Sequence, residues 1–309
     1  MIEWRRKVMP MIAAAVLGPF VSITDSADAS DSVGWTGLQN VSGRKGYTDT
    51  PMGQMHYRVL GEGVPVLLLH QTPWFSVQYA KVQPLFAERG LQTIAVDTPG
   101  FGFSDTPDKQ PTIEDYANNL PYILDDLEIE KLAVAGFHTG ASIAAAFAHL
   151  HPGRATCLIL DGAPLYTEEE RLQRLSVSTW DQSPRADGSH LSDRFRFIRD
   201  RITNNTAELE SINWSVLSFF MAGEAEHYGH VAAFTYDMKP AIRGFTMPTL
   251  IVSHTADSLH MAAGRIMEMR PDFQYKEFRG GNSHVIYDNP GLWVEAVLPF
   301  VKLHNIPQP

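Results

Sequence analysis

The stretch KLAVAGFHTGASIAAAFAHL, residues 131–150, joins an apolar run to an alanine-rich run through the five residues GFHTG. The first run predicts a buried strand and the second a helix. Glycines at 136 and 140, two positions either side of His138, permit a sharp strand-to-helix turn with close backbone approach. The turn would present His138 at a helix N-terminus, where unpaired N–H groups stabilise developing negative charge. Residue 138 is therefore the first candidate for chemistry.

The rest of the chain repeats this alternation of strands and helices. Apolar runs predict strands at 55–60, 64–69, 91–96, 131–135, 156–160, 248–253 and 274–278, and helical spacing predicts helices at 78–90, 113–127, 141–150, 262–269 and 292–301. Such alternation predicts an α/β fold with a mostly parallel central sheet flanked by helices on both faces. Between 165 and 243 the alternation fails, and many charged and aromatic residues occur at helical spacing. We expect a helical lid there, inserted between two strands.

Four further motifs are collinear with this pattern: HQTP at 70–73, DTPGFGFSD at 97–105, Asp257 after the 248–253 strand, and GGNSH at 280–284. In order and spacing they resemble the α/β-hydrolase fold family, over roughly 47–301 within a domain expected at 47–303. The resemblance implies that residue 138 is the nucleophile position, Asp257 the catalytic acid and His284 the base. It also implies an oxyanion hole formed by the backbone N–H groups of Thr72 and Thr139.

The chain departs from the family pattern at two positions. His138 stands where the family has Ser, Cys or Asp, and Gln71 stands where it usually has Gly. A neutral imidazole can attack acyl groups without a separate base, although its ring reaches further than a serine oxygen. The resemblance gives His70 a structural role under the oxyanion loop. It leaves Asp161, after the 156–160 strand, as an alternative acid ranked below Asp257.

Three functions remain open at this point. In the first, His138, Asp257 and His284 form a triad-like set in a hydrolase of an ester, amide or similar bond, which we take as the leading hypothesis. In the second, a His284–Asp257 dyad is a general base in a lyase, isomerase or cofactor-free oxygenase. In the third, His138 marks an inactive elbow in a ligand-binding protein. Two His and one Asp also match an iron-binding facial triad. The family geometry instead directs Asp257 at the back of His284, so we expect no metal.

The flanks of the expected oxyanion hole carry Gln71, Trp74, Phe75 and Phe137 as substrate-binding candidates, and they favour an apolar or aromatic small molecule. No glycine-rich phosphate loop or dinucleotide fingerprint occurs, so no organic cofactor is expected. Twenty-five basic and thirty-five acidic residues give a net charge of −10, which disfavours nucleic acid as a partner.

The N-terminus has the pattern of an export signal. A basic start at 5–7, an apolar stretch at about 8–23 and Ala-Asp-Ala at 27–29 predict a signal peptide over 1–29, with a flexible lead-in at 30–46. The mature protein would then be periplasmic or secreted, with no stable membrane span after cleavage. The single cysteine, Cys157, lies in an apolar run and is expected to be buried.

Overall fold

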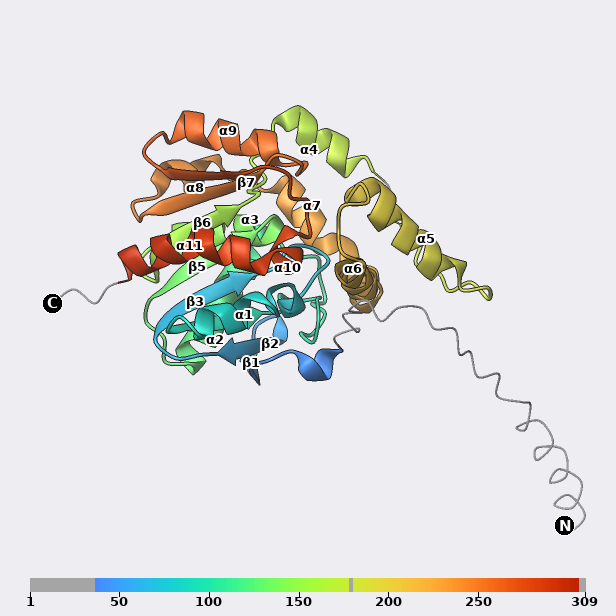
Figure 1. The fold of residues 1–309 in the computed structure, drawn as a ribbon, viewed down its shortest axis with the longest axis horizontal. Coiled ribbons are helices and arrows are strands. Elements are labelled where there is room, and N and C mark those ends of the chain that lie inside the picture. The colour runs from blue at the N-terminus through green and yellow to red at the C-terminus, as the bar shows by residue number, and fades with distance from the viewer. Residues whose placement is uncertain (1–36, 178–179, 306–309) are drawn as a thin grey trace, which may run out of the picture. The chain divides into compact units, whose positions relative to one another are not determined.

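The computed structural model describes residues 37–177 and 180–305, so the expected signal peptide and residues 30–36 of the expected lead-in lie outside the described residues. Eight strands form one sheet in the order β1-β2-β4-β3-β5-β6-β7-β8 (Figure 1). Their bounds are β1 Arg44–Thr50, β2 Gly53–Leu60, β3 Val64–Leu69, β4 Leu91–Val96, β5 Leu132–Phe137, β6 Ala155–Asp161, β7 Thr249–His254 and β8 Gln274–Phe278. Only the β1–β2 and β2–β4 pairs are antiparallel, which confirms the expected mostly parallel sheet.

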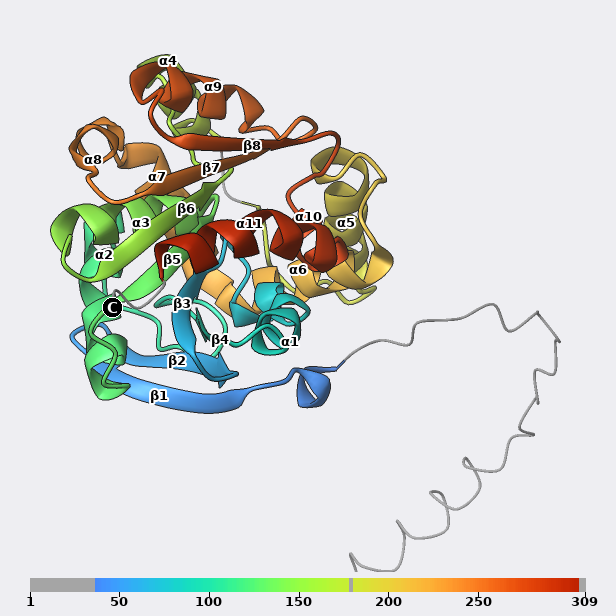
Figure 2. The ribbon, with the colours of Figure 1, turned by 60° about the vertical axis from the view of Figure 1, so that its left-hand side comes forward.

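Helices cover both faces of the sheet (Figure 2). One layer contains α1 (Val82–Ala87) and α11 (Pro290–His304), and the other contains α2 (Ile113–Asp126), α3 (Thr139–Leu150), α8 (Lys239–Gly244) and α9 (His260–Met269). Strand β3 shows why both faces are apolar: Val66 and Leu68 belong to the core under α1 and α11, whereas Leu67 and Leu69 belong to the opposite core. Successive strand residues point to opposite faces, so a doubly covered strand must be apolar throughout.

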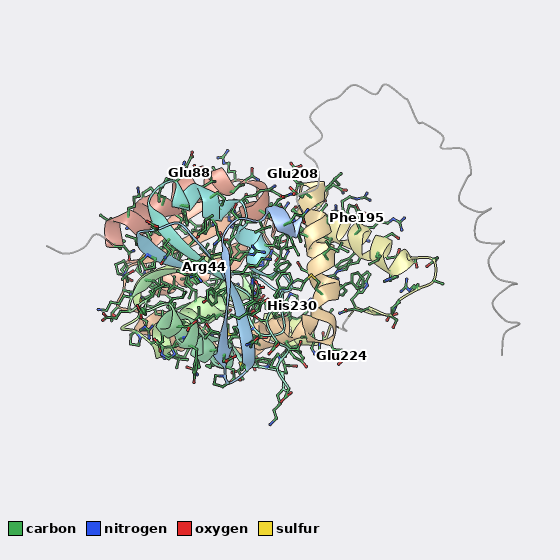
Figure 3. The ribbon with its side chains drawn as sticks, turned by 90° about the horizontal axis from the view of Figure 1, so that it is seen from below. Arg44, Glu88, Phe195, Glu208, Glu224 and His230 are labelled. Atoms are coloured by element: carbon green, nitrogen blue, oxygen red, sulfur yellow. The ribbon has the colours of Figure 1, made fainter. Side chains whose placement is uncertain are left out.

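The stretch between β6 and β7 forms a helical insertion. It contains α4 (Glu168–Leu175), α5 (Ser189–Phe197), a π-helical turn (Ile198–Ile202), α6 (Leu209–Ala222) and α7 (Tyr228–Thr235), followed by α8. Figure 3 shows α6 with Glu208 labelled at its start, beside α5, which carries Phe195. A short helix, α10 (Val285–Asp288), follows β8 and begins directly after His284.

The structure differs from the sequence prediction in two places. Strand β1 begins at Arg44 and a 3-10 turn occupies Leu38–Asn40, so the expected lead-in at 30–46 already contains ordered elements. The helix expected at 78–90 is divided into a 3-10 turn, Ser76–Tyr79, and the short α1. Strand β1 has mostly exposed or half-buried residues, because one neighbour, β2, is its only partner in the sheet. An edge strand of this kind lacks the apolar run by which buried strands are recognised.

Candidate active site

The strand-to-helix elbow between β5 and α3 forms as expected from its glycines. A Cβ atom at Gly136 would collide with the Gly140 carbonyl oxygen, and one at Gly140 would collide with the Leu69 carbonyl oxygen. His138 itself has φ +51° and ψ −114°, a region that costs an L-residue about 1–3 kcal/mol. Its backbone N–H donates to the Asp161 carbonyl at 3.0 Å, which ties the elbow to the end of β6. The side chain of His138 is thus held at the carboxyl end of the parallel strands.

The imidazole of His138 is paired with Asp257. Its Nε2 lies 2.8 Å from Asp257 Oδ2, and the two side chains are 16% and 2% exposed. Burial opposes ionisation of Asp257, but the charge of His138 and its hydrogen bond hold the pKa of this carboxyl below its ordinary value. An ionised carboxylate can only accept, so Nε2–H donates and the proton-free lone pair is on Nδ1. The ring stacks on Phe137 at 4.2 Å between centroids, and its Cδ2–Nε2 edge lies against Gly162.

His284, the base implied by the family resemblance, has a different partner. Its Nδ1 lies 3.1 Å from the hydroxyl of Ser211 on α6, and no hydrogen bond joins it to Asp257 among the described residues. Ser211 donates its own proton to the Glu208 carbonyl at 2.9 Å, so Nδ1–H of His284 is the donor to Ser211. Burial, and then the charge of His138, lower the pKa of His284 to about 3.

The expected His284–Asp257 dyad is therefore not the arrangement found. Asp257, the acid after β7, bonds the elbow histidine instead, because the imidazole of His138 extends far enough to reach it. A serine at position 138 would be too short to do so, and Asp257 would remain free to pair with His284. His284 is 3% exposed and packs edge-on against Trp74, with 5.2 Å between ring centroids. One Asp–His pair is retained, but the histidine in it is at the nucleophile position.

The two expected oxyanion donors are both available. The backbone N–H groups of Thr72 and Thr139 donate to no acceptor within the described part of the chain. Thr139 is the first residue of α3, so the N-terminal end of the helix dipole also faces this point. Gln71, which stands where the family usually has glycine, is held by two hydrogen bonds. Its backbone N–H donates to the side-chain oxygen of Gln78, and its side-chain amide donates to the Ser283 carbonyl at 2.5 Å.

His70 supports the same loop, as its family position implied. Its Nδ1 lies 2.9 Å from the Gln71 carbonyl, and its Nε2 accepts from the backbone N–H of Thr98 at 3.0 Å. Complete burial lowers the pKa of His70, against the smaller effect of its bond to the Gln71 carbonyl. A neutral ring can serve as donor at Nδ1 and acceptor at Nε2 at once, which this position requires.

A cavity of about 290 Å³ lies over the elbow. Of the predicted site residues, its wall contains Gln71, Thr72, Trp74, His138, Thr139 and Asp257. His284 is outside the wall, as are the substrate-binding candidates Phe75 and Phe137, which are fully buried in the core. Phe75 follows the HQTP motif and Phe137 lies within GFHTG, but both side chains pack into the core. A larger open depression of about 750 Å³, lined by residues such as Asp105 and Tyr122, contains none of these groups.

The wall also holds three arginines and a histidine that the sequence prediction did not select. They are Arg174, Arg194, Arg201 and His230, all from the helical insertion. In the sequence these arginines stand out only as part of a charged stretch. Helical spacing distinguishes an arginine of the cavity wall from an outward-facing one. Arg194 and Arg196 are two positions apart on α5, so their side chains point in nearly opposite directions.

Asp161, the alternative acid, has a separate histidine partner. Its carboxylate lies 3.1 Å from Nε2 of His254 and accepts from the indole of Trp293 at 2.8 Å. The two side chains of the pair are 0% and 1% exposed. Asp161 is therefore not directed at the cavity, which agrees with its lower rank.

Within the described residues, no three His, Cys, Asp or Glu side chains gather closely enough to hold a metal ion. His138 and Asp257 bond each other, and His284 bonds Ser211, so the facial-triad arrangement weighed above is not assembled. No helix in 37–177 and 180–305 is long and apolar enough to cross a membrane.

Known proteins share this fold. Residues 64–203 match the family model of the alpha/beta hydrolase fold. An uncharacterized hydrolase of Saccharomyces cerevisiae is 34% identical over 33% of the chain, a match that spans only 36% of the relative's length. The 2-hydroxy-6-oxo-2,4-heptadienoate hydrolase of Pseudomonas putida is 29% identical over 80% of the chain and 89% of its own length.

The solved structures agree on the architecture. E-2-(acetamidomethylene)succinate hydrolase superposes with a TM-score of 0.69 at 20% identity, covering 84% of this chain and 99% of the other. A thermophilic esterase from Thermogutta terrifontis gives 0.66 at 19% identity, covering 85% of this chain and 100% of the other. With the elbow and the parallel sheet, these likenesses show that the chain has the α/β-hydrolase fold.

Proposed function

We propose that the protein is a hydrolase that cleaves an ester, amide or similar bond of a small molecule, with His138 as its catalytic base. The observation that carries this proposal is the 2.8 Å bond between His138 Nε2 and Asp257 Oδ2. A carboxylate on one imidazole nitrogen orients the ring and stabilises the imidazolium that forms when the other nitrogen takes a proton. The pair therefore provides a base directly beside the two oxyanion donors.

The reaction follows from these contacts. Nδ1 of His138 takes a proton from a water molecule while the water oxygen attacks the scissile carbonyl carbon. The carbonyl oxygen becomes an oxyanion and accepts hydrogen bonds from the Thr72 and Thr139 N–H groups. Collapse of the tetrahedral intermediate breaks the bond to the leaving group, which receives the proton from Nδ1–H. Asp257 keeps its negative charge throughout.

Water activation falls to His138 because His284 is poorly suited to it. A general base works best when its pKa is near the working pH, and the pKa of His284 is about 3. His284 stays neutral beside His138, so no like charge opposes the proton that His138 takes up. A mechanism in which His138 is itself acylated would leave the hydrolytic water with this weaker base.

The wall supports a ligand with an apolar or aromatic body, since Trp74, Tyr166, Phe234, Ile198 and Leu259 all contribute to it. Several of these residues come from the helical insertion, which is the basis for proposing that the insertion acts as the lid over the cavity. The names of the two hydrolases similar over most of the chain, both acting on small organic molecules, support the same substrate size.

A panel of p-nitrophenyl esters and p-nitroanilides tests the proposal. His138→Ala should lower kcat by about 10²–10⁴-fold, the usual cost of losing a general base. His149→Ala, an exposed histidine on the same helix α3, is the matched control and should keep wild-type rates. A wild type inert toward the whole panel would overturn the hydrolase assignment. Intact-mass spectrometry during turnover tests the role of His138. An acyl adduct on His138 would show that it acts as a nucleophile and not as a general base.

Export of the protein is a second part of the proposal, resting on the basic start, apolar stretch and Ala-Asp-Ala end of residues 1–29. The mature chain should then begin near Ser30, in a periplasmic or secreted protein. N-terminal sequencing of protein isolated from its native host measures this directly, and a mature chain beginning at Met1 or Ile2 would contradict it.

A further inference from the structure

The cavity wall has an excess of positive charge. Arg174, Arg194 and Arg201 contribute to it, whereas Asp257 is its one acidic residue and is already paired with His138. None of the three arginines has a carboxylate within ion-pair distance in residues 37–177 and 180–305. Outward-facing arginines of the same insertion differ, since Arg185 and Arg196 both pair with Asp193. The cavity wall thus gathers three arginines that have no ion pair among the described residues.

Arg194 is the most constrained of the three. Its guanidinium carbon lies 3.8 Å from the ring centroid of Phe219, and Trp180 and Phe197 lie at 5.4 and 5.3 Å. Its Nε is buried and has no hydrogen-bond partner among the described residues. Aromatic faces hold a guanidinium flat and attract its charge, but they accept no conventional hydrogen bond. Packing thus orients the guanidinium of Arg194 and leaves its Nε without an acceptor among the described residues. The charge of Glu226, which lies beyond ion-pair distance, acts on Arg194 and opposes the effect of burial on its pKa.

Arg174 is held in the same way, with its guanidinium carbon 4.6 Å from the ring centroid of Tyr166 and 5.7 Å from that of Phe234. His230 connects this end of the cavity to the elbow. Burial lowers its pKa first, and the charges of Arg194, His138 and Arg174 lower it further, in that order. His230 therefore lies within electrostatic reach of both the arginines and the catalytic base, so one small ligand can span from one to the other.

We propose that Arg194, with Arg174 and Arg201, forms an anion subsite that binds a free carboxylate of the substrate. This inference rests on the proposed hydrolase function and names its substrate class: esters or amides of small molecules that carry a carboxylate away from the scissile bond. The planar guanidinium fork matches a carboxylate, and removal from water strengthens the charge-assisted bonds. The sequence prediction of an apolar or aromatic ligand is extended by this charged group.

Two matched esters test the subsite in turnover. Mono-p-nitrophenyl succinate carries a terminal carboxylate, and p-nitrophenyl butyrate has an acyl chain of the same length without one. Wild type should prefer the succinate ester in kcat/KM. Arg194→Gln should reduce this preference by about 10- to 100-fold, as expected for lost hydrogen bonds to a charged group. Arg196→Gln, on the same helix but paired with Asp193 and 63% exposed, is the control and should leave the preference unchanged. Equal rates on both esters in wild type would overturn the subsite.

A binding measurement separates this inference from the proposed function. Calorimetric titration of glutarate into His138→Ala requires no catalysis and should show binding that Arg194→Gln, added to it, abolishes. Glutarate binding that depends on Arg194 in a protein inert toward every ester would uphold the subsite and overturn the hydrolase. Ester hydrolysis without glutarate binding would do the reverse. Inorganic phosphate binding more tightly than glutarate would overturn the carboxylate assignment.

Discussion

Two aspartate–histidine pairs lie at the carboxyl ends of three neighbouring strands, and they have opposite surroundings. His138 follows β5 and pairs with Asp257 after β7, at 2.8 Å. Asp161 ends β6 and pairs with His254 at the end of β7, at 3.1 Å. The chemical groups are the same, and both pairs lie near the elbow. Their difference is in what surrounds the histidine.

His138 lines the cavity and is 16% exposed, so its Nδ1 edge is available to a ligand. His254 is 1% exposed, stacked on Phe278 at 5.2 Å, with its Nδ1 buried and unpartnered. The Asp161 carboxylate receives the Trp293 indole as an additional donor. Access to one imidazole nitrogen, rather than the pairing itself, is what makes an Asp–His pair a candidate base. The sealed pair, Asp161 and His254, instead joins strands β6 and β7 to Trp293 of α11.

The largest expected effect of this difference is on turnover. Asp257→Asn should lower kcat on the best ester by about 10²–10⁴-fold, because an amide can donate to Nε2 and so place the proton on Nδ1, where a base needs its lone pair. Asp161→Asn is the matched change in the sealed pair. We expect kcat per folded enzyme within about threefold of wild type, since His254 reaches no ligand. Equal losses in both variants would erase the distinction between the two pairs.

The second effect is on stability, where Asp161→Asn should be affected more than Asp257→Asn. Breaking a buried ion pair by removing one partner costs about 3–5 kcal/mol, so Asp161→Asn should be the less stable variant. Burial disfavours the charged ring, but the charge and hydrogen bond of Asp161 raise the pKa of His254. A raised histidine pKa gives stability that is complete below the unfolded value and is lost as pH rises through the folded value.

Urea denaturation followed by tryptophan fluorescence, at about pH 6 and about pH 9, measures both parts. The deficit of Asp161→Asn should be larger at the lower pH. The pKa of Asp257 is lowered, against burial, by His138, so its contribution is present above the unfolded carboxyl value and disappears only as pH falls through the folded value. The Asp257→Asn deficit should therefore stay constant over the same interval. A deficit of Asp161→Asn that grows with pH would contradict the assignment.

The sequence was sufficient for the sheet and the elbow. Strands β3 and β4 have the predicted bounds, because runs such as VPVLLL at 64–69 must be buried on both faces. Strand β8 also has the predicted bounds, although its residues are mostly exposed. Gly136 and Gly140 mark the turn because no side chain fits at either position. The same reasoning located the residues after each strand, and so brought His138, Asp257 and the two N–H donors to one cavity.

Side-chain partners could not be predicted in the same way. The family resemblance assigned Asp257 to His284 by position, but the choice between two imidazoles depends on ring length and rotamer, which no spacing encodes. Ser211 is distant in sequence from His284 and lies in a stretch where only helical character was evident. Phe137 lies within the elbow motif and Phe75 follows HQTP, yet both are fully buried, because their side chains pack into core clusters.

The smallest expected effect concerns His284, which is bonded to Ser211 and not to Asp257. Ser211 accepts Nδ1–H of His284 at 3.1 Å, which fixes the ring with its lone pair on Nε2. Ser211→Ala removes one neutral hydrogen bond, worth about 1 kcal/mol, and should change kcat by no more than about tenfold. Ser211→Thr keeps the hydroxyl and should restore the wild-type rate. Because His284 is outside the cavity wall and has a pKa of about 3, its orientation should matter far less than that of His138. A loss of kcat in Ser211→Ala as large as that in Asp257→Asn, reversed in Ser211→Thr, would make His284 the base and reduce the His138–Asp257 pair to a support.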